Sequence, residues 1–376
     1  MDFSLSSEQE AVRDLARKIL SERCSDERSA QLERTGVWFD EALWGELVKA
    51  NLVGLALPEE VGGSGFGMLE VMLVLQEVGR HLAPVPWFAS LVLGGLPIAR
   101  FGSEAQCRRW LVPAAGEGLV LTAALIETGS ADPAQPRVTA RRDGRAWRLD
   151  GVKECVPAGT LAGLLLVPAK TPEGVGVFLV EPGGAGVALE RELATNREPQ
   201  ARLTLDGAKL AEEAVLGDPV RGGEIVEWLL DRALVGLCAI QLGVAEEALR
   251  RTAEYTRTRK QFGRAIASFQ GVALRAADAY IDLEAMRSTL LQAAWRIAED
   301  LPARPEVAAA KWWACRGGQR VVHTAQHLHG GIGADIEYPI HRFFLWSKQL
   351  DVTLGGASRQ LARLGALLVA GPGAQA

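Results

Sequence analysis

The sequence of 376 residues predicts a mainly α-helical protein with a β domain in the middle of the chain. Hydrophobic residues recur at helical spacing up to Gly118 and again from Gly223, whereas they alternate with polar residues in between. This order places helices and strands in separate layers. The expected parts are an N-terminal helical domain at 1–117, an antiparallel sheet or β-barrel at 118–217, a C-terminal four-helix bundle at 218–370 and a flexible tail at 371–376.

The N-terminal region is predicted to be helical from its capping pattern and its spacing. Ser7 and Glu10 have the pattern of a capping box, and Val12 and Leu20 follow on one helix face. Proline and clustered glycines at 57–65 predict a loop. Further helices are expected at 40–52, 68–78, 88–101 and 104–111.

Turn signals divide the middle region into strands. Asp143-Gly144 and Asp150-Gly151 are dipeptides typical of hairpin turns. Strands are expected at 146–149, 164–167, 175–180, 187–189 and 201–205. The C-terminal region returns to helical spacing, and long helices are expected at 225–257, 269–300, 305–329 and 338–350.

Charge and cysteine usage exclude several classes of protein. The 46 acidic and 41 basic residues leave a net charge of −5, so no extended positive field would hold nucleic acid. No uncharged run reaches the roughly 18 residues of a membrane helix, and the acidic N-terminal region does not fit a signal peptide. The five scattered cysteines form no Cys-x-x-Cys pair. We therefore expect a cytoplasmic protein that binds neither membranes nor nucleic acid.

A metal site is not expected. His323 and His327 are four residues apart and could share a helix face, but no carboxylate or cysteine stands beside them at ligand spacing. A packed or helix-end histidine explains both residues.

Three local sequences occupy corresponding places in this order of elements. The segment 57–65 reads Leu-Pro-Glu-Glu-Val-Gly-Gly-Ser-Gly, the segment 256–263 reads Thr-Arg-Thr-Arg-Lys-Gln-Phe-Gly and is followed by Phe269-Gln270, and the segment 326–333 reads Gln-His-Leu-His-Gly-Gly-Ile-Gly. Together they resemble the acyl-CoA dehydrogenase family over essentially the whole chain. The resemblance implies the fold of that family and FAD as the cofactor.

The resemblance also implies a reaction and a shared site. In the family, the flavin lies between the sheet domain and the C-terminal helices, and its adenosine end reaches a neighbouring subunit. A glutamate removes the proton beside the thioester carbonyl of an acyl-CoA, and the flavin accepts a hydride from the next carbon. Because that proton is weakly acidic, the carboxylate must be held close to the carbon and shielded from water.

Residues for the adenosine end of FAD are present in this sequence. By the resemblance, Arg259 offers a planar donor fork to phosphate oxygens, and Phe262 can pack on the adenine. A glycine pair lets the backbone approach the cofactor. The family's glutamine before this pair is offset, so either Gln326 or His327 takes its place. The expected cofactor-binding residues are Arg259, Gln261, Phe262, Gln270, Gln326, His327, Gly330 and Gly331.

Residues for the flavin ring and for the catalytic base are missing. Val156-Pro157 stands where the family has side-chain donors near the ring. The two positions that the family uses for the base fall on Leu354 and Ala233, so no catalytic residue is assigned. Asp351 and Asp231 are off register; Asp231 is two residues before Ala233, about 200° around the helix.

This one-sided loss predicts a subunit that works with a partner. The leading hypothesis is the non-catalytic subunit of an α2β2 acyl-CoA dehydrogenase, in which a homologous catalytic subunit supplies the flavin-ring site, the glutamate and access to the acyl-CoA. The segments 338–346 and 354–358 are similar to subunits that act on steroid side-chain CoA thioesters. An electron-transfer flavoprotein is the acceptor by family analogy. Two alternatives remain: a self-sufficient homotetramer with a displaced base, and a flavin-free scaffold subunit.

Overall fold

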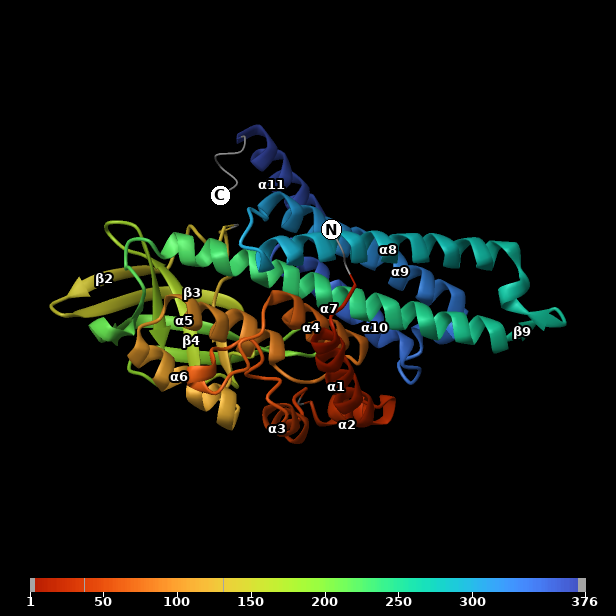
Figure 1. Cartoon of the computed structure of the whole chain (residues 1–376), viewed down its shortest axis with the longest axis horizontal. Helices are drawn as coiled ribbons and strands as arrows, with labels where there is room; N and C mark the ends of the chain where they lie inside the picture. The colour runs from red at the N-terminus through yellow and green to blue at the C-terminus, as the bar shows by residue number, and fades with distance from the viewer. Residues whose placement is uncertain (1–3, 37, 131, 371–376) are drawn as a thin grey trace. The chain divides into compact units, whose positions relative to one another are not determined.

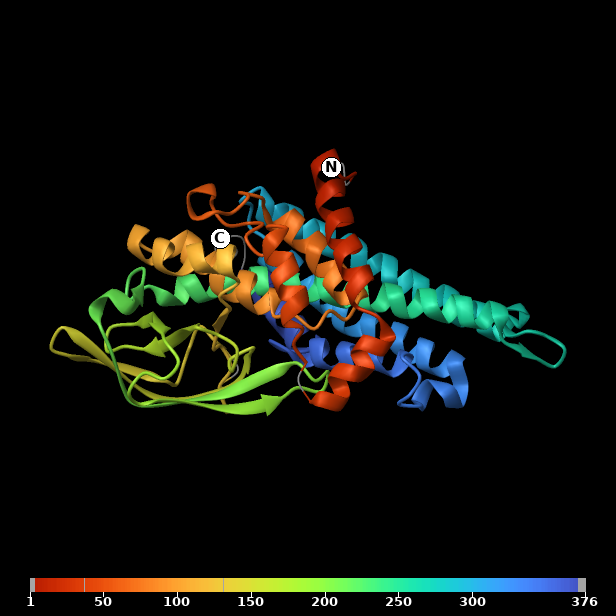
Figure 2. The same cartoon turned by 90° about the horizontal axis from the view of Figure 1, so that it is seen from below.

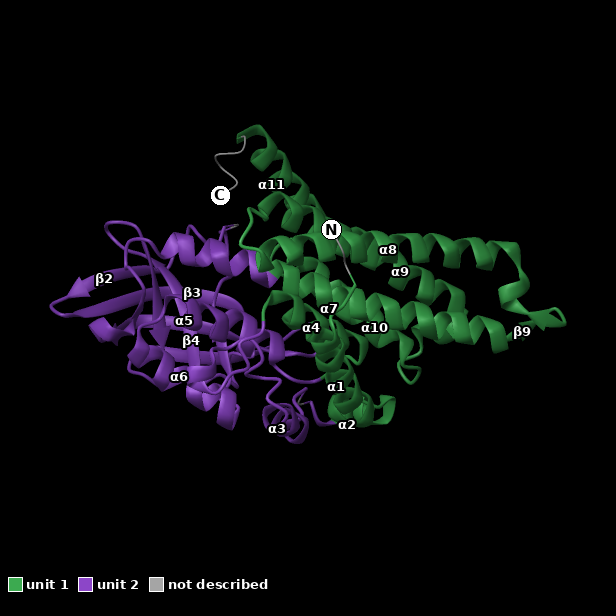
Figure 3. Ribbon diagram, in the orientation of Figure 1, with its two compact units in different colours: residues 1–34, 67–83, 234–376 green, residues 35–66, 84–233 purple. Residues whose placement is uncertain are grey.

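A computed structural model describes residues 4–36, 38–130 and 132–370, so the tail expected at 371–376 lies outside the described residues. Helices make up most of the described chain, and a sheet occupies the middle of the sequence (Figure 1). The predicted fold class is confirmed. Two compact units form the chain, one from Met1–Arg34, Gly67–Ala83 and Leu234–Ala376 and the other from Thr35–Phe66 and Pro84–Ala233 (Figure 3).

The first unit is helical. Its helices are α1 (Ser7–Arg23), α2 (Asp26–Thr35), α4 (Met68–Arg80), α8 (Gln270–Ala298), α9 (Arg304–His329), α10 (Ile340–Val352), α11 (Ala357–Ala370) and most of α7 (Gly222–Thr258). A two-stranded hairpin of β9 (Lys260–Gln261) and β10 (Arg264–Ala265), followed by the turn η4 (Ile266–Ser268), connects α7 to α8. It lies at one end of these two helices in both views (Figures 1 and 2). The short turn η5 (Gly330–Ala334) follows α9 directly.

The second unit combines short helices with the sheet. Its helical segments are α3 (Glu41–Lys49), η1 (Glu59–Val61), the π-helix η2 (Phe88–Gly95), α5 (Leu96–Phe101), α6 (Glu104–Glu117), η3 (Glu212–Ala214) and the start of α7. Its strands are β1 (Leu121–Ala123), β2 (Thr139–Asp143), β3 (Ala146–Pro157), β4 (Leu164–Lys170), β5 (Val175–Val180), β6 (Val187–Leu193), β7 (Pro199–Leu210) and β8 (Val215–Leu216).

The sheet is mostly antiparallel. Its strand order is β6-β7-β3-β2-β4-β5-β8, and β1 pairs with β4. The pairs β1–β4 and β2–β4 are parallel, whereas the remaining pairs are antiparallel. Trp147 and Phe178 are buried on this sheet with their ring centroids 5.3 Å apart, in an edge-to-face contact.

The turn predicted at Asp150-Gly151 is wrong. Gly151 lies inside β3, and the register of β3 with β7 shifts between Leu149 and Gly151. The glycine adopts a φ of 138°, a value that is strained for any residue with a β-carbon. A bulge therefore bends one long strand at the place where the sequence indicated a hairpin.

The capping box of α1 lies one residue before the predicted one. The Ser6 hydroxyl accepts a hydrogen bond from the Gln9 N–H at 3.2 Å, and the Gln9 side chain accepts one from the Ser6 N–H at 3.1 Å. The prediction that Ser7 and Glu10 form the capping box is wrong. Glutamine serves this motif as well as glutamate does, so the Ser6–Gln9 pair forms it one residue earlier.

Two glycines let α4 and α7 approach closely. A β-carbon on Gly79 would overlap the carbonyl of Ile240, and one on Gly243 would overlap the carbonyl of Gln76. Each helix thus presents a glycine to the backbone of the other. Close backbone packing brings α4 against the middle of α7 within the first unit.

Substituting Gly243 with alanine is expected to destabilise the protein by about 1–3 kcal/mol, because the added methyl group forces the two helices apart. Gly223→Ala is a matched control in the same helix, since its β-carbon would have no neighbour within 4 Å. Thermal unfolding of both variants checks the prediction. Equal melting temperatures for the two variants would contradict the close contact.

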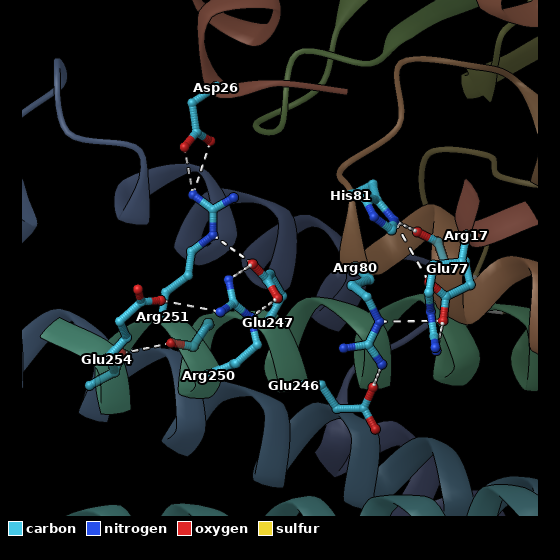
Figure 4. Close-up of polar contacts among 12 residues, drawn as sticks. Arg17, Asp26, Glu77, Arg80, His81, Glu246, Glu247, Arg250, Arg251 and Glu254 are labelled. Atoms are coloured by element: carbon cyan, nitrogen blue, oxygen red, sulfur yellow. Dashed lines mark hydrogen bonds and ion pairs between the residues drawn. The ribbon is translucent and has the colours of Figure 1, made fainter. Parts of the chain in front are cut away.

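Ion pairs also join the N-terminal helices to α7 (Figure 4). Arg17 of α1 pairs with the buried Glu77 of α4 at 2.8 Å, and Arg80 of α4 pairs with Glu246 of α7. Arg251 of α7 contacts Asp26 at the start of α2, at 2.8 Å. Figure 4 shows these pairs as two neighbouring chains of contacts, which hold α1, α2 and α4 against α7.

Helix α7 is the one described helix that is long and apolar enough to cross a membrane. Within its most apolar stretch, 83% of the residues are buried inside the fold. Such burial is typical of a core helix in a globular protein.

Candidate functional site

The β9–β10 hairpin carries three of the predicted cofactor residues. Arg259 directly follows α7, Gln261 lies in β9, and Phe262 forms the turn with Gly263. Phe262 is 94% exposed and has a φ of 52°. A left-handed conformation is strained for a bulky side chain, and such outliers gather at functional sites. An exposed, strained phenylalanine indicates a surface that contacts another molecule.

The N-terminus of α8 lies on the other side of this hairpin. Gln270 is the first residue of α8 and is exposed. The first turn contains no acidic residue, and the N-cap residue Phe269 provides no side-chain hydrogen bond. The positive end of the helix dipole is therefore left uncompensated by the helix itself, a condition that favours an anion.

The glycine pair lies at the other helix end, after α9. Gly330 adopts a φ of 65°, and a β-carbon at Gly330 or Gly331 would meet nothing within 4 Å. The turn therefore presents bare backbone, with room for a ligand to approach. Both glycines are exposed, as the predicted cofactor role requires.

The structure separates the two candidates for the glutamine position. Gln326 is directed into its own turn, where its amide nitrogen donates to the carbonyl of Gly333. His327 is exposed and lies on a groove of about 820 Å³. Helices α8 and α9 form this groove, and its lining includes Arg275, Asp278, Ile281, Arg320, His323 and His327. His327 is thus the more exposed of the two side chains, and its contact with a cofactor stays a prediction.

An aromatic cluster brings the ends of α7 and α9 together. Tyr255 of α7 stacks on His329, the last residue of α9, with centroids 4.4 Å apart and an interplanar angle of 20°. Tyr338 lies 5.4 Å from the ring of His329. The cluster links the segment that carries Arg259 to the segment that carries the glycine pair. The sequence analysis missed it, although an aromatic residue one turn before Arg259 and a histidine before the glycines were visible signals.

These residues fit the adenosine diphosphate end of a nucleotide cofactor. Arg259 and the uncompensated start of α8 suit phosphate oxygens, Phe262 suits a flat base, and the bare glycine turn admits close approach. All of them belong to the first unit.

The region expected near a flavin ring has a different character. Val156 is fully buried in β3, so it faces the core of the sheet. Cys155 is exposed rather than packed. Neighbouring protein atoms still exclude part of the water from its thiol, and this partial desolvation, together with the charges of Glu192 and Glu154, raises its pKa. A raised pKa disfavours the reactive thiolate. Neither residue offers the polar donor that this position has in the family pattern.

The predicted base positions hold no carboxylate. Ala233 is fully buried in α7. Leu354 lies in the turn before α11 with a φ of 56°, and the amide of Gln360 donates to its carbonyl at 3.2 Å. Asp231 is buried, and Asp351 is half-buried at the end of α10, where its carbonyl accepts a hydrogen bond from the Cys315 thiol. The turn is well formed although it lacks an acid.

The described residues contain no group of three metal-ligating side chains. His323 instead lies 3.3 Å from the ammonium of Lys348 and edge-on to Phe344, and burial lowers its pKa. His323 and His327 both line the α8–α9 groove.

Two family models identify the class of protein to which this fold belongs. The N-terminal domain model of acyl-CoA dehydrogenases matches residues 6–117, and the C-terminal domain model matches residues 221–367. The chain belongs to the acyl-CoA dehydrogenase family. Members of this family are oxidoreductases that act on CH–CH bonds, and their cofactor is FAD.

The similar proteins include an acyl-CoA dehydrogenase and chains of two solved structures. The acyl-CoA dehydrogenase FadE27 of Mycobacterium tuberculosis is 40% identical over 99% of this chain and 100% of its own length. The solved structure of the ChsE4-ChsE5 complex from Mycobacterium tuberculosis contains a chain that is 41% identical, covers 99% of this chain and 100% of its own length, and has a TM-score of 0.93. A chain of the Tcur3481-Tcur3483 steroid ACAD is 44% identical, with a TM-score of 0.91 over 98% of this chain and all of its own length.

Proposed function

We propose that this chain is the base-lacking subunit of a heteromeric, FAD-dependent acyl-CoA dehydrogenase. The observation that carries the proposal is the contrast between Leu354 and Arg259. The turn expected to hold the catalytic glutamate has the apolar Leu354 in its place, whereas the surface proposed for the adenosine end keeps an exposed arginine beside a helix start that has no acidic residue. A chain can lose one half of a site and stay functional when another chain supplies that half.

Each chain then has its own task. This chain holds the adenosine diphosphate end of FAD through residues on the hairpin, at the start of α8 and at the end of α9: Arg259, Gln261, Phe262, Gln270, His327, Gly330 and Gly331. Gln326 supports the glycine turn from inside. Bound FAD supplies the two-electron acceptor for the removal of two hydrogens. The partner supplies the carboxylate that removes the proton beside the thioester carbonyl, a contribution worth roughly 10²–10⁴-fold in rate.

The relatives support a proposal for the substrate and for the assembly. Because chains of a steroid ACAD and of a two-component complex are 41–44% identical to this one, we propose an α2β2 assembly that acts on a steroid side-chain CoA thioester. An electron-transfer flavoprotein is the proposed acceptor, and the cytoplasm the proposed location. We propose that the three domains end at residues 117, 217 and 370.

The expected result of expression is a chain that holds little flavin by itself and a yellow complex with one FAD per pair of subunits. The test purifies this chain alone and together with a homologue that carries the glutamate, and records flavin absorbance and the FAD-to-protein ratio. A stable, yellow lone chain with one FAD per subunit that oxidises an acyl-CoA would replace the proposal with a self-sufficient enzyme.

A further inference from the structure

The aromatic stack lies between the two segments that carry the proposed cofactor residues. On α7, the N–H of Arg259 donates to the carbonyl of Tyr255 at 2.8 Å, so the tyrosine is one helical turn before the arginine. On α9, His329 directly precedes the glycine pair. The Tyr255 hydroxyl also lies 3.5 Å from the His329 carbonyl, which it reaches as a donor. One hydrogen bond therefore joins a side chain near the end of α7 to the backbone at the end of α9.

The imidazole of His329 is held by its own helix. Its Nδ1 lies 2.8 Å from the carbonyl of Ala325, so Nδ1 carries the proton and donates. Its Nε2 is buried, since only 3% of the residue is exposed, and this nitrogen has no hydrogen-bond partner among the described residues. Burial lowers the pKa of His329, which favours the neutral ring. What this ring contributes to its neighbours is a flat, uncharged surface.

We propose that Tyr255 and His329 are positioning residues for the cofactor. Their stack fixes the separation between Arg259 at the end of α7 and the glycine pair at the end of α9, and it thereby sets the width of the surface that takes the adenosine diphosphate of FAD. Tyr338 supports the stack, with its ring centroid 6.4 Å from that of Tyr255. This inference rests on the proposed function. Neither residue of the stack has to touch the cofactor in order to act.

The predicted consequence is a selective loss of flavin affinity. Without the stack, the ends of α7 and α9 lose the ring contact that joins them, and binding must order them again at a cost in free energy. An aromatic pair of this geometry corresponds to roughly a three- to tenfold change in the dissociation constant of FAD. His329→Ala should show this change. His329→Phe should stay within about twofold of the parent, because phenylalanine keeps the flat ring. Nε2 has no partner to lose among the described residues, and the Ala325 carbonyl that Nδ1 contacts keeps its place in the backbone hydrogen bonding of α9.

The test titrates FAD into flavin-free protein, purified with its co-expressed partner or alone if the lone chain is stable, and follows the quenching of flavin fluorescence. Size-exclusion chromatography and thermal unfolding of the flavin-free variants report assembly and stability separately. Tyr255→Leu removes the stack from the other side, and its affinity for FAD tests the positioning role if His329→Ala does not fold. Tyr255→Phe is its matched control.

Three results separate the possible failures. If His329→Phe binds FAD as weakly as His329→Ala, the histidine acts through a polar contact and the stacking role is overturned. If Arg259→Ala weakens FAD binding while His329→Ala and Tyr255→Leu leave it unchanged, the positioning role fails and the proposed function stands. If all three variants bind FAD like the parent, the proposed function fails as well.

Discussion

Lys153→Met is expected to lower the free energy of unfolding by about 3–5 kcal/mol. Lys153 is fully buried, and its ammonium donates to Glu127 Oε1 at 2.6 Å. The same carboxylate accepts hydrogen bonds from the backbone N–H groups of Arg137 and Val138. Removal of the ammonium leaves a buried carboxylate without its counter-charge. Burial lowers the pKa of Lys153, whereas the hydrogen bond and the charge of Glu127 act in the opposite direction. The charged lysine is therefore stable in the core only while Glu127 is beside it.

Urea unfolding followed by circular dichroism measures this effect. The double variant Glu127→Gln with Lys153→Met should recover much of the lost stability, because no isolated charge stays buried. Lys209→Met is the surface control: Lys209 lies in the neighbouring strand β7, and its side chain is 61% exposed. We expect its effect to stay within about 0.5 kcal/mol. A Lys153→Met variant as stable as Lys209→Met would contradict the buried pair.

Arg259→Ala is expected to weaken FAD binding roughly ten- to hundredfold, because it removes a charge-assisted hydrogen bond to a phosphate oxygen. Arg259 is exposed and follows the last turn of α7, so its removal leaves the core of the first unit unchanged. Assembly with the partner should therefore persist. The flavin content of the purified complex and a fluorescence titration with FAD both report the loss.

Arg257→Ala provides the matched control, since this arginine is also exposed and lies two residues earlier, in the last turn of α7. It should retain the flavin content of the parent. If Arg259→Ala also retained it, the surface at the end of α7 would not hold the cofactor, and a flavin-free scaffold would become the better account of this chain.

The sequence allowed the fold class and the long helices to be predicted because their hydrophobic spacing persists over many turns. Short or polar elements escaped it. Helix α2 (Asp26–Thr35) buries only Ser29 and Leu32, and α11 (Ala357–Ala370) buries only Gln360, so neither has a long buried stripe. The bulge at Gly151 and a hairpin use the same residue for the same reason, a positive φ, and only the pairing of β3 with β7 distinguishes them.

The candidate site was predictable as a set of residues but not as a set of contacts. Motif spacing indicated Arg259 and the glycine pair, yet it left Gln326 and His327 as alternatives, because a one-residue offset turns a helical side chain by about 100°. The structure shows Gln326 bonded to Gly333 and His327 on the groove. The stack of Tyr255 on His329 joins residues 74 positions apart, and no local pattern reports such a contact.

The ion pairs that hold the N-terminal helices to α7 also impose an order on synthesis. Asp26 and its partner Arg251 are 225 residues apart, and Arg17, Glu77 and Arg80 likewise belong to the first unit, whose last segment starts at Leu234 inside α7. At about 5–20 residues per second, roughly 10–35 seconds pass between translation of α4 and of the part of α7 that pairs with it. The second unit is almost contiguous and can fold during this interval. The apolar faces of α1 and α4 stay exposed until their partner helices have been synthesised. Nascent chains that stall in this interval are therefore the ones most exposed to aggregation.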